Sequence, residues 1–331
     1  MHDSIGSDVN QVKVTSLSHV RGQRQVTDTL HTHLQAYFNM RATTGHSDLS
    51  FGPTLLCGPR GTGKTLTAQA IHSELGNLRF ILTNGETLNR TSELFLVLIN
   101  ADAYTTVLID EAQATNAKTQ HILLTAISER ILPVSTGSSR SGYAVPLKNF
   151  TLILATTHEY LLQDALRDRM RIYCRFSYYA VEDLVEIVRQ RAEALNWRYE
   201  SAEVLRTIAE RSKGTPRQAL NRYLQTCWSM VKSHDGDIIT MEDTLRAFHQ
   251  LQVDELGLED IDRRYLNVLA QHGPTPLGVA SARLGLPAGT LQSVIEPYLL
   301  REDLFTKDKS SMRIITEKGW RHLEMTAWPV K

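Results

Sequence analysis

The stretch TLLCGPRGTGKTLTAQAIHSELG, Thr54 to Gly76, decides the fold of this 331-residue chain. The apolar run Thr54 to Cys57 predicts a short buried strand, and the amphipathic run from Lys64 predicts a helix. A glycine-rich turn lies between them, so the pattern GxxxxGKT has the strand before it and the helix after it that a phosphate-binding loop requires. Backbone N–H groups of such a loop surround phosphate oxygens, and the helix N-terminus adds positive potential. The stretch therefore predicts an α/β domain that binds a phosphorylated ligand.

Two side chains of this loop carry chemistry. Lys64 is expected to reach the terminal phosphates, and the hydroxyl of Thr65 is expected to ligate Mg²⁺. A glycine-rich turn that merely opens a structural helix is the alternative. The strand, the turn and the helix all follow in order, which favours the phosphate site.

Two further apolar runs end in polar side chains. TTVLIDEAQ ends its β-branched run at Asp110, which is placed to hold Mg²⁺ directly or through water, and Glu111, which is placed to polarise an attacking water. Two acids after a strand could instead complement the dipole of a following helix. FTLILATT, Phe150 to Thr157, ends in two hydroxyls, and in a parallel sheet such a residue sits between the acids and the γ-phosphate. Thr157 is thus a candidate to orient the water or to cap the next helix, and the two roles can coexist.

Composition limits the class of protein. Lys plus Arg and Asp plus Glu both number 36, so any DNA contact would have to be a local patch. The cysteines Cys57, Cys174 and Cys227 are odd in number, far apart and without zinc-ligand spacing. A disulfide framework or a zinc site is therefore not expected, and a reducing cytosol fits best. No signal pattern opens the chain, and no apolar run approaches the roughly 18 residues of a membrane span. We expect a cytoplasmic protein of two or three domains that does not enter a membrane.

The stretch LRDRM, Leu166 to Met170, places two arginines on either side of an aspartate. Because the phosphate loop has its own lysine, these arginines would suit a terminal phosphate at a subunit boundary. An arginine supplied in trans contributes on the order of 10³–10⁵ in rate. A surface helix end with exposed ion pairs to Asp168 is the alternative, and the residues alone leave both open. In KGTPRQALNRYL a glycine and a proline precede a helix, so Arg217 lies in its first turn, where a lid domain could bring it to the γ-phosphate.

The order GPRGTGKT, LIDEAQ, LILATT, LRDRM, GTPR resembles the AAA+ ATPases, and its details are similar to the RuvB family, the bacterial motors that drive branch migration of Holliday junctions. FTLILATT followed by ALRDRM is similar to that family's sensor-1 strand and arginine-finger segment, GTPRQALNRYL to its sensor-2 helix, and IEPYLLREDLF to a segment of its winged helix. The similarity runs from about Val12 to His322. It implies an α/β AAA+ nucleotide domain with a parallel sheet in residues 1–178, an all-α lid in 179–254 and a C-terminal winged helix in 255–331.

The resemblance also assigns roles to positions. It implies an ATP site formed by Val12, Lys13, Gly58, Gly61, Thr62, Gly63, Lys64, Thr65, Leu66, Tyr179 and Arg217, with Mg²⁺ held by Thr65 and Asp110. The implied catalytic set is Lys64, Asp110, Glu111, Thr157, Arg169 and Arg217, with Arg169 at the finger position and Arg167 as its neighbour. The chain departs from the family at Arg60, His158 and the pair Met170-Arg171. Its N-terminal turn keeps only Gly22 and Gln23 of the family's base-binding turn.

Two more segments offer binding surfaces. Residues 129–150 read as a β-hairpin around a Gly/Ser-rich tip, with a surface loop as the alternative. The equivalent hairpin in the family docks the junction-binding partner, which makes candidate contacts of Ile131, Val134, Tyr143 and Val145. From about Leu256, three amphipathic helices and two strands predict a winged helix, a common DNA-binding unit. Its wing carries Lys307, Lys309 and Arg313, which could position the protein on phosphates without reading sequence, although such a turn could also be merely solvated or bind protein.

The resemblance implies an ATPase that translocates duplex DNA through a homo-hexameric ring during branch migration, in DNA recombination and repair. The implied partners are four-way junction and duplex DNA, a RuvA-like junction-binding protein and a RuvC-like resolvase. An initiator or clamp-loader type of DNA-binding switch with slow ATP turnover is the alternative, and the hairpin between the acidic and sensor strands favours the motor. A DNA scaffold that binds nucleotide without hydrolysis is a third class, and the intact Glu111 argues against it.

Overall fold

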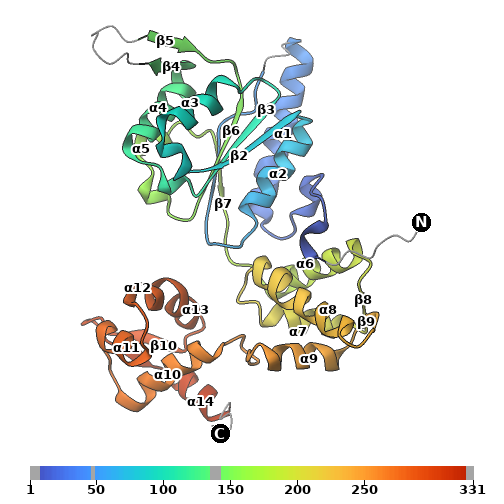
Figure 1. Ribbon diagram of the computed structural model, residues 1–331, viewed down its shortest axis with the longest axis vertical. Helices are drawn as coiled ribbons and strands as arrows, with labels where there is room; N and C mark the ends of the chain where they lie inside the picture. Colours follow the sequence, from blue (N-terminus) through green and yellow to red (C-terminus); the bar gives the residue numbers. More distant parts are fainter. Residues whose placement is uncertain (1–7, 46–48, 135–142, 326–331) are drawn as a thin grey trace. The chain divides into compact units, whose positions relative to one another are not determined.

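The computed structural model of the chain describes residues 8–45, 49–134 and 143–325. The chain divides into two compact units (Figure 1), the first formed by Asn10–Ile187 with Thr215–Arg217 and the second mainly by Val188–Gly214 and the chain from Gln218 onward. In the described ranges no helix is both long enough and apolar enough to cross a bilayer.

A five-stranded parallel sheet is the centre of the first unit, as the sequence predicts. Its strand order is β2-β3-β6-β1-β7, with bounds Arg79–Asn84, Thr105–Asp110, Thr151–Thr156, Thr54–Cys57 and Ile172–Arg175. The central strands β1 and β6 are buried along their whole length, which explains their continuous aliphatic runs. Because all five strands run the same way, the phosphate loop, the acids and the sensor hydroxyls meet at the carboxyl edge.

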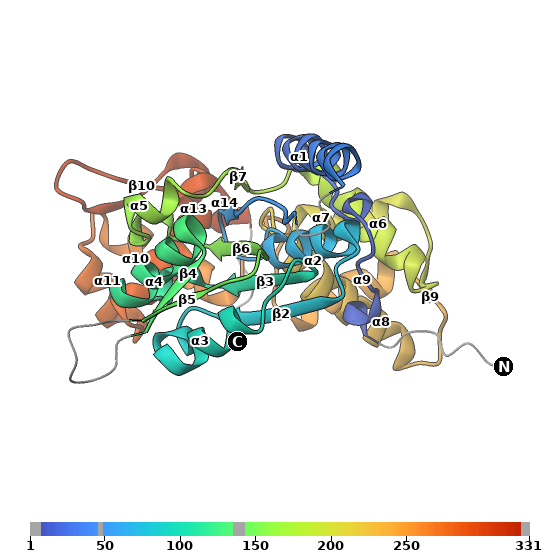
Figure 2. The same ribbon diagram turned by 90° about the horizontal axis from the view of Figure 1, so that it is seen from above.

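Helices cover both faces of this sheet (Figure 1). One apolar core contains side chains of α1 (Arg24–Thr44) and α2 (Lys64–Leu75). A second core, on the opposite face, contains side chains of α3 (Thr91–Ile99), α4 (Ala117–Glu129) and α5 (Asp164–Arg167). The strands β4 (Ile131–Val134) and β5 (Tyr143–Pro146) form an antiparallel pair between α4 and β6, seen together in Figure 2. The predicted tip between them lies outside the described residues.

The second unit begins within α6 (Val181–Ala194) and is mainly helical. It continues through α7 (Ala202–Glu210), the π-helix η6 (Gln218–Leu224), α8 (Gln225–Lys232) and α9 (Met241–Gln250). A short parallel ladder joins β8 (Arg198–Tyr199) to β9 (Ile238–Ile239). Trp197 and Trp228 stack face to face inside this part, with ring centroids 4.8 Å apart.

The C-terminal part has the predicted three helical segments and wing. The helices are α10 (Asp260–His272), α11 (Leu277–Leu284) and a run of α12, the π-helix η7 and α13 over Ala288–Thr290, Leu291–Ile295 and Glu296–Arg301. The wing strands are β10 (Phe305–Lys307) and β11 (Arg313–Ile315), which pair antiparallel. A further helix, α14 (Glu317–Met325), was not predicted. Thr316 caps it by accepting the N–H of Gly319 at 3.1 Å.

Candidate nucleotide site

Glycine is required in the phosphate loop by backbone conformation and by space. Gly58, Gly61 and Gly63 have φ angles of 142°, 76° and 98°, which L side chains rarely adopt. A Cβ atom added to Gly58 would lie 2.4 Å from the carbonyl oxygen of Phe176, and one added to Gly61 would lie 2.9 Å from Cβ of Arg217. The loop conformation therefore requires glycine at these positions.

Lys64 is held inside the loop that it is expected to serve. Its Nζ donates to the carbonyl oxygens of Gly58 at 2.8 Å and Pro59 at 2.7 Å. Burial lowers the pKa of Lys64 to about 8, and the nearby charges of Asp110 and Glu111 partly oppose that shift. An incoming phosphate would favour the charged ammonium in the same way, because an anion nearby stabilises it.

The acidic strand meets the loop at Thr65. The Thr65 hydroxyl donates to Oδ2 of Asp110 at 2.9 Å, and the backbone N–H of Glu111 donates to Oδ1 of Asp110 at 2.9 Å. A hydroxyl and a carboxylate in contact fit Mg²⁺, which takes oxygen ligands and keeps several waters rather than an all-protein cage. Glu111 has a left-handed backbone, with φ 46° and ψ 45°. This unusual conformation of a non-glycine residue turns the chain directly after the strand.

Gln113 joins the acidic strand to the sensor strand, and sequence reasoning missed this residue. Its Nε2 donates to Oε2 of Glu111 and, at 3.2 Å, to Oγ1 of Thr157. Its Oε1 accepts the hydroxyl of Thr156 at 2.6 Å. The only available signal was its position two residues after Glu111, which does not reveal the neighbouring strand.

Residues remote in sequence also reach the loop. The hydroxyl of Tyr179 donates to the carbonyl of Thr62 at 2.9 Å, and the backbone N–H of Arg217 donates to the carbonyl of Gly61 at 3.3 Å. Burial raises the pKa of Tyr179 to about 12, so its hydroxyl stays protonated. Gln23 exchanges two hydrogen bonds with the backbone of Ser177, at 2.7 and 3.1 Å.

Three residues expected to contact ATP, Val12, Lys13 and Leu66, are not part of the hydrogen-bonded groups around the phosphate loop. Lys13 is exposed and Val12 is half-buried, in a segment fastened to α2 by the Ser73 hydroxyl, which donates to the carbonyl of Val14 at 3.1 Å. Leu66 packs against the core that contains α1 and α2. Within the described part of the chain, the side chain of Lys13 makes no hydrogen bond to the phosphate loop, and Val12 and Leu66 have only aliphatic side chains. The nucleotide contacts of all three stay a prediction.

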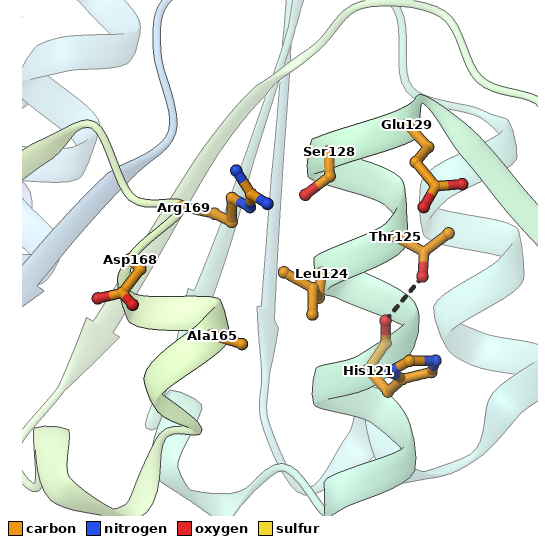
Figure 3. A pocket seen from close by; sticks show the side chains of 8 residues that line it. All are labelled: His121, Leu124, Thr125, Ser128, Glu129, Ala165, Asp168 and Arg169. Carbon is orange, nitrogen blue, oxygen red and sulfur yellow. Dashed lines mark hydrogen bonds between the residues drawn. The ribbon is translucent and has the colours of Figure 1, made fainter.

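The two arginines of LRDRM have different surroundings. Arg167 pairs with Asp164, and not with Asp168, the partner named in the alternative of a surface helix end. Arg169 is exposed, and within the described residues its side chain has no hydrogen-bond or ion-pair partner. It points into a cavity of about 470 Å³ beside α4, lined also by Leu124, Ser128 and Asp168 (Figure 3). The structure thus leaves Arg169 available to a group outside the chain.

The cations predicted to bind DNA from the wing differ in exposure and pairing. Arg313 is only 5% exposed, because its Nε donates to Oε1 of the buried Glu296 at 2.9 Å. Nζ of Lys307 lies 2.6 Å from the other carboxylate oxygen of Glu296. Arg313 thus serves an ion pair inside the domain and exposes little of its side chain to DNA, and its contact with phosphate stays a prediction. Lys309 is exposed and, among the described residues, has no ion-pair partner.

The candidate hairpin contacts also differ in exposure. Tyr143 is 66% exposed, whereas Val145 packs against the core of the first unit. Ile131 is half-buried, and the side chain of Val134 lies outside the described residues. Tyr143 is therefore the candidate contact best placed to meet a partner.

All the cysteines are buried, and none forms a disulfide. Burial raises the pKa of Cys57, Cys174 and Cys227 to about 12 in each case. The Sγ of Cys57 lies 3.6 Å from the carbonyl oxygen of Cys174, on the neighbouring strand of the sheet. These thiols therefore pack as small apolar groups.

Comparison with known proteins gives consistent matches along the chain. Residues 12–176 match the Holliday junction DNA helicase RuvB P-loop domain, residues 179–254 the RuvB AAA lid domain, and residues 255–324 the RuvB C-terminal winged helix domain. The Holliday junction branch migration complex subunit RuvB of Paracoccus denitrificans is 36% identical over 279 residues, which are 83% of this chain and 81% of that protein.

Solved structures agree with these matches. The Thermotoga maritima RuvB Holliday junction branch migration motor has a TM-score of 0.77 at 30% identity, over 94% of this chain and 98% of that one. A point mutant of the same protein has a TM-score of 0.79 at 29% identity, over 97% and 100% of the two chains. Both likenesses extend across the nucleotide site and the winged helix.

Proposed function

The chain belongs to the RuvB family of Holliday junction branch migration motors, and from that premise we propose how its residues convert ATP hydrolysis into DNA movement. It is an ATPase. The observation that carries the residue assignments is the meeting of Lys64, the Thr65–Asp110 pair and Glu111 at one edge of the sheet.

In the proposed reaction, the loop amides and Lys64 hold the β- and γ-phosphates of ATP. Thr65 and Asp110 would hold Mg²⁺, which supplies positive charge to the phosphate oxygens. Glu111 polarises a water molecule, and Thr157 orients it. The water oxygen bonds to the γ-phosphorus while the bond from that phosphorus to the β–γ bridging oxygen breaks, and ADP and phosphate leave. Arg217, next to Gly61, is proposed to contact the γ-phosphate from the lid side.

Arg169 is proposed to act on a neighbouring subunit of a homo-hexameric ring. Its side chain is exposed and lacks a partner among the described residues, and the chain's own loop already has Lys64. A guanidinium reaching the γ-phosphate across a subunit boundary would make hydrolysis depend on assembly. The hairpin of β4 and β5, which carries Tyr143, is proposed to dock a RuvA-like protein. Lys309 of the wing is proposed to contact duplex DNA.

The remaining proposals concern organisation. We place the domain boundaries at residues 1–178, 179–254 and 255–331, supported by family matches that change at nearly the same positions. We also propose a cytoplasmic location and a RuvC-like resolvase as a further partner, and the family membership supports both proposals.

ATPase activity measured with and without a four-way junction and the host's junction-binding protein tests the proposal. We expect the two additions together to stimulate turnover beyond either alone, with migration of a labelled junction that stops when Glu111 is replaced by Gln. Turnover that is slow and indifferent to both additions would instead indicate a switch of the initiator or clamp-loader type.

A further inference from the structure

Gln113 occupies a position between the two strands that supply the proposed water-binding groups. It lies in the short 3-10 turn η4 (Ala112–Ala114), directly after the left-handed Glu111. Its side chain is half-buried. The side-chain amide nitrogen of Gln113 donates both to Oε2 of Glu111 and to Oγ1 of Thr157. The two hydrogens of a primary amide allow both bonds at once.

The other end of this amide is fixed by the buried sheet. The hydroxyl of Thr156, which is 1% exposed, donates to Oε1 of Gln113 at 2.6 Å. The same hydroxyl oxygen accepts the backbone N–H of His158 at 3.1 Å. A hydrogen bond into the amide oxygen polarises the amide and strengthens its N–H donors. The orientation of Gln113 is therefore set by β6.

These bonds leave one carboxylate oxygen of Glu111 and the hydroxyl hydrogen of Thr157 available for chemistry. Oε2 of Glu111 is occupied by Gln113, while Oε1 faces the exposed Arg60, whose Nε is 3.9 Å away. Thr157 accepts from Gln113 and retains its own hydroxyl hydrogen, which can point to Nδ1 of His158 at 2.9 Å or to a ligand. Without the amide, the Glu111 carboxylate, with 43% of its side chain exposed, would sample several rotamers.

We propose that Gln113 is a positioning residue for ATP hydrolysis, which holds the Glu111 carboxylate and the Thr157 hydroxyl at a fixed separation around the attacking water. This inference rests on the proposed role of Glu111. It requires that the amide affect the hydrolytic step and not the affinity for ATP, because Lys64, Thr65 and Asp110 make no bond to Gln113 in the described structure.

The first test replaces Gln113 by Met, which keeps the length of the side chain and removes both polar ends. We expect kcat to fall by about 10- to 100-fold, the loss that a misplaced catalytic group causes, with KM and the Kd for ATP changed less than about twofold. Gln120→Met is the matched control. Gln120 also bridges two segments, but its amide nitrogen donates to the backbone carbonyls of Thr115 and Leu161, so its loss should lower Tm without lowering kcat.

The second test replaces Gln113 by Glu and follows kcat against pH. Two adjoining carboxylates cannot both ionise easily, so the pKa of one rises. When the introduced carboxyl is protonated, its O–H can replace the amide donor. The measured quantity is the kcat of Gln113→Glu divided by the kcat of Gln113→Met at the same pH. We expect this ratio to rise as pH falls from about 8 to about 6. Arg60 and His158 also face this network, in both variants.

The outcomes separate this inference from the proposal beneath it. If Glu111→Gln retains wild-type turnover, the role of Glu111 is wrong. If Glu111→Gln is inactive but Gln113→Met turns over at the wild-type rate, the inference alone fails. A Gln113→Met variant that loses ATP affinity as much as kcat would also overturn it, as would a Gln113→Glu ratio that does not change with pH.

Discussion

Replacing Arg313 by Met should loosen the wing. Glu296 is 2% exposed and receives hydrogen bonds from Arg313 and from the hydroxyl of Tyr265, both at 2.9 Å, with Lys307 at 2.6 Å. Removing one partner of a buried ion pair costs about 3–5 kcal/mol. Because Lys307 and Tyr265 remain, we take the lower end, about 3 kcal/mol, for the opening of the wing.

Hydrogen–deuterium exchange of the full chain measures this loss locally. At about 1.4 kcal/mol per factor of ten, about 3 kcal/mol corresponds to about 10²-fold faster exchange for amides of β10 and β11, whereas amides of the parallel sheet should exchange as before. Lys309→Ala is the control, since that lysine has no ion-pair partner among the described residues. A change below about fivefold in the wing, or an equal change in the control, would show that the ion pair of Arg313 does not hold the wing closed.

The pH dependence of the same measurement has a definite sign. The pKa of Glu296 is lowered in the folded state, because the bonds from Arg313, Lys307 and Tyr265 outweigh its burial. A carboxyl with a depressed folded pKa contributes stability that is present above its unfolded pKa of about 4.3. That contribution is lost as pH falls through the folded value. The ratio of exchange rates between Arg313→Met and the wild type, for the amides of β10 and β11, should therefore be constant near neutral pH and fall below about pH 4.3.

Further predictions concern hydrolysis and DNA. Glu111→Gln should bind ATP and Mg²⁺ as before but not hydrolyse ATP, since Lys64 and the Thr65–Asp110 pair are intact; undiminished phosphate release would exclude Glu111 from its role. Arg169→Ala should lose hydrolysis and keep ATP affinity, and mixing it with Lys64→Ala should restore some ATPase that neither has alone. If mixed rings form and stay inactive, Arg169 does not act in trans. Lys309→Ala should reduce the slope of log K against log salt for duplex DNA by about one unit, equally across sequences, and an unchanged slope would place the DNA surface elsewhere.

The sequence predicted those elements whose signals are local. The strand Thr54–Cys57 and the start of the helix at Lys64 agree with the structure residue for residue, because the glycine-rich turn marks both boundaries. The helices and strands of the C-terminal part also agreed, since each shows its own periodicity. The helix α14 was not predicted, although its residues follow a clear amphipathic pattern.

The side-chain networks could not be predicted in the same way. The contact of Gln113 with Thr156 and Thr157 depends on the pairing of β3 with β6, which places residues more than 40 positions apart side by side. The ion pair of Arg313 could not be predicted for a related reason. Arg313 looked like a surface cation in a polar turn, and nothing in the chain near it reveals that Glu296, on another element, neutralises it.

The burial of every native thiol has a practical consequence for experiments on the assembled motor. With pKa values of about 12 for Cys57, Cys174 and Cys227, about one in 10⁵ of these groups is a thiolate at pH 7, and the thiolate is the form that attacks maleimides. A cysteine introduced at an exposed position such as Lys309 would have an ordinary pKa and react first. Fluorophores could thus be attached at chosen sites without first removing the native cysteines, which would allow single-molecule observation of motion in an otherwise unaltered protein.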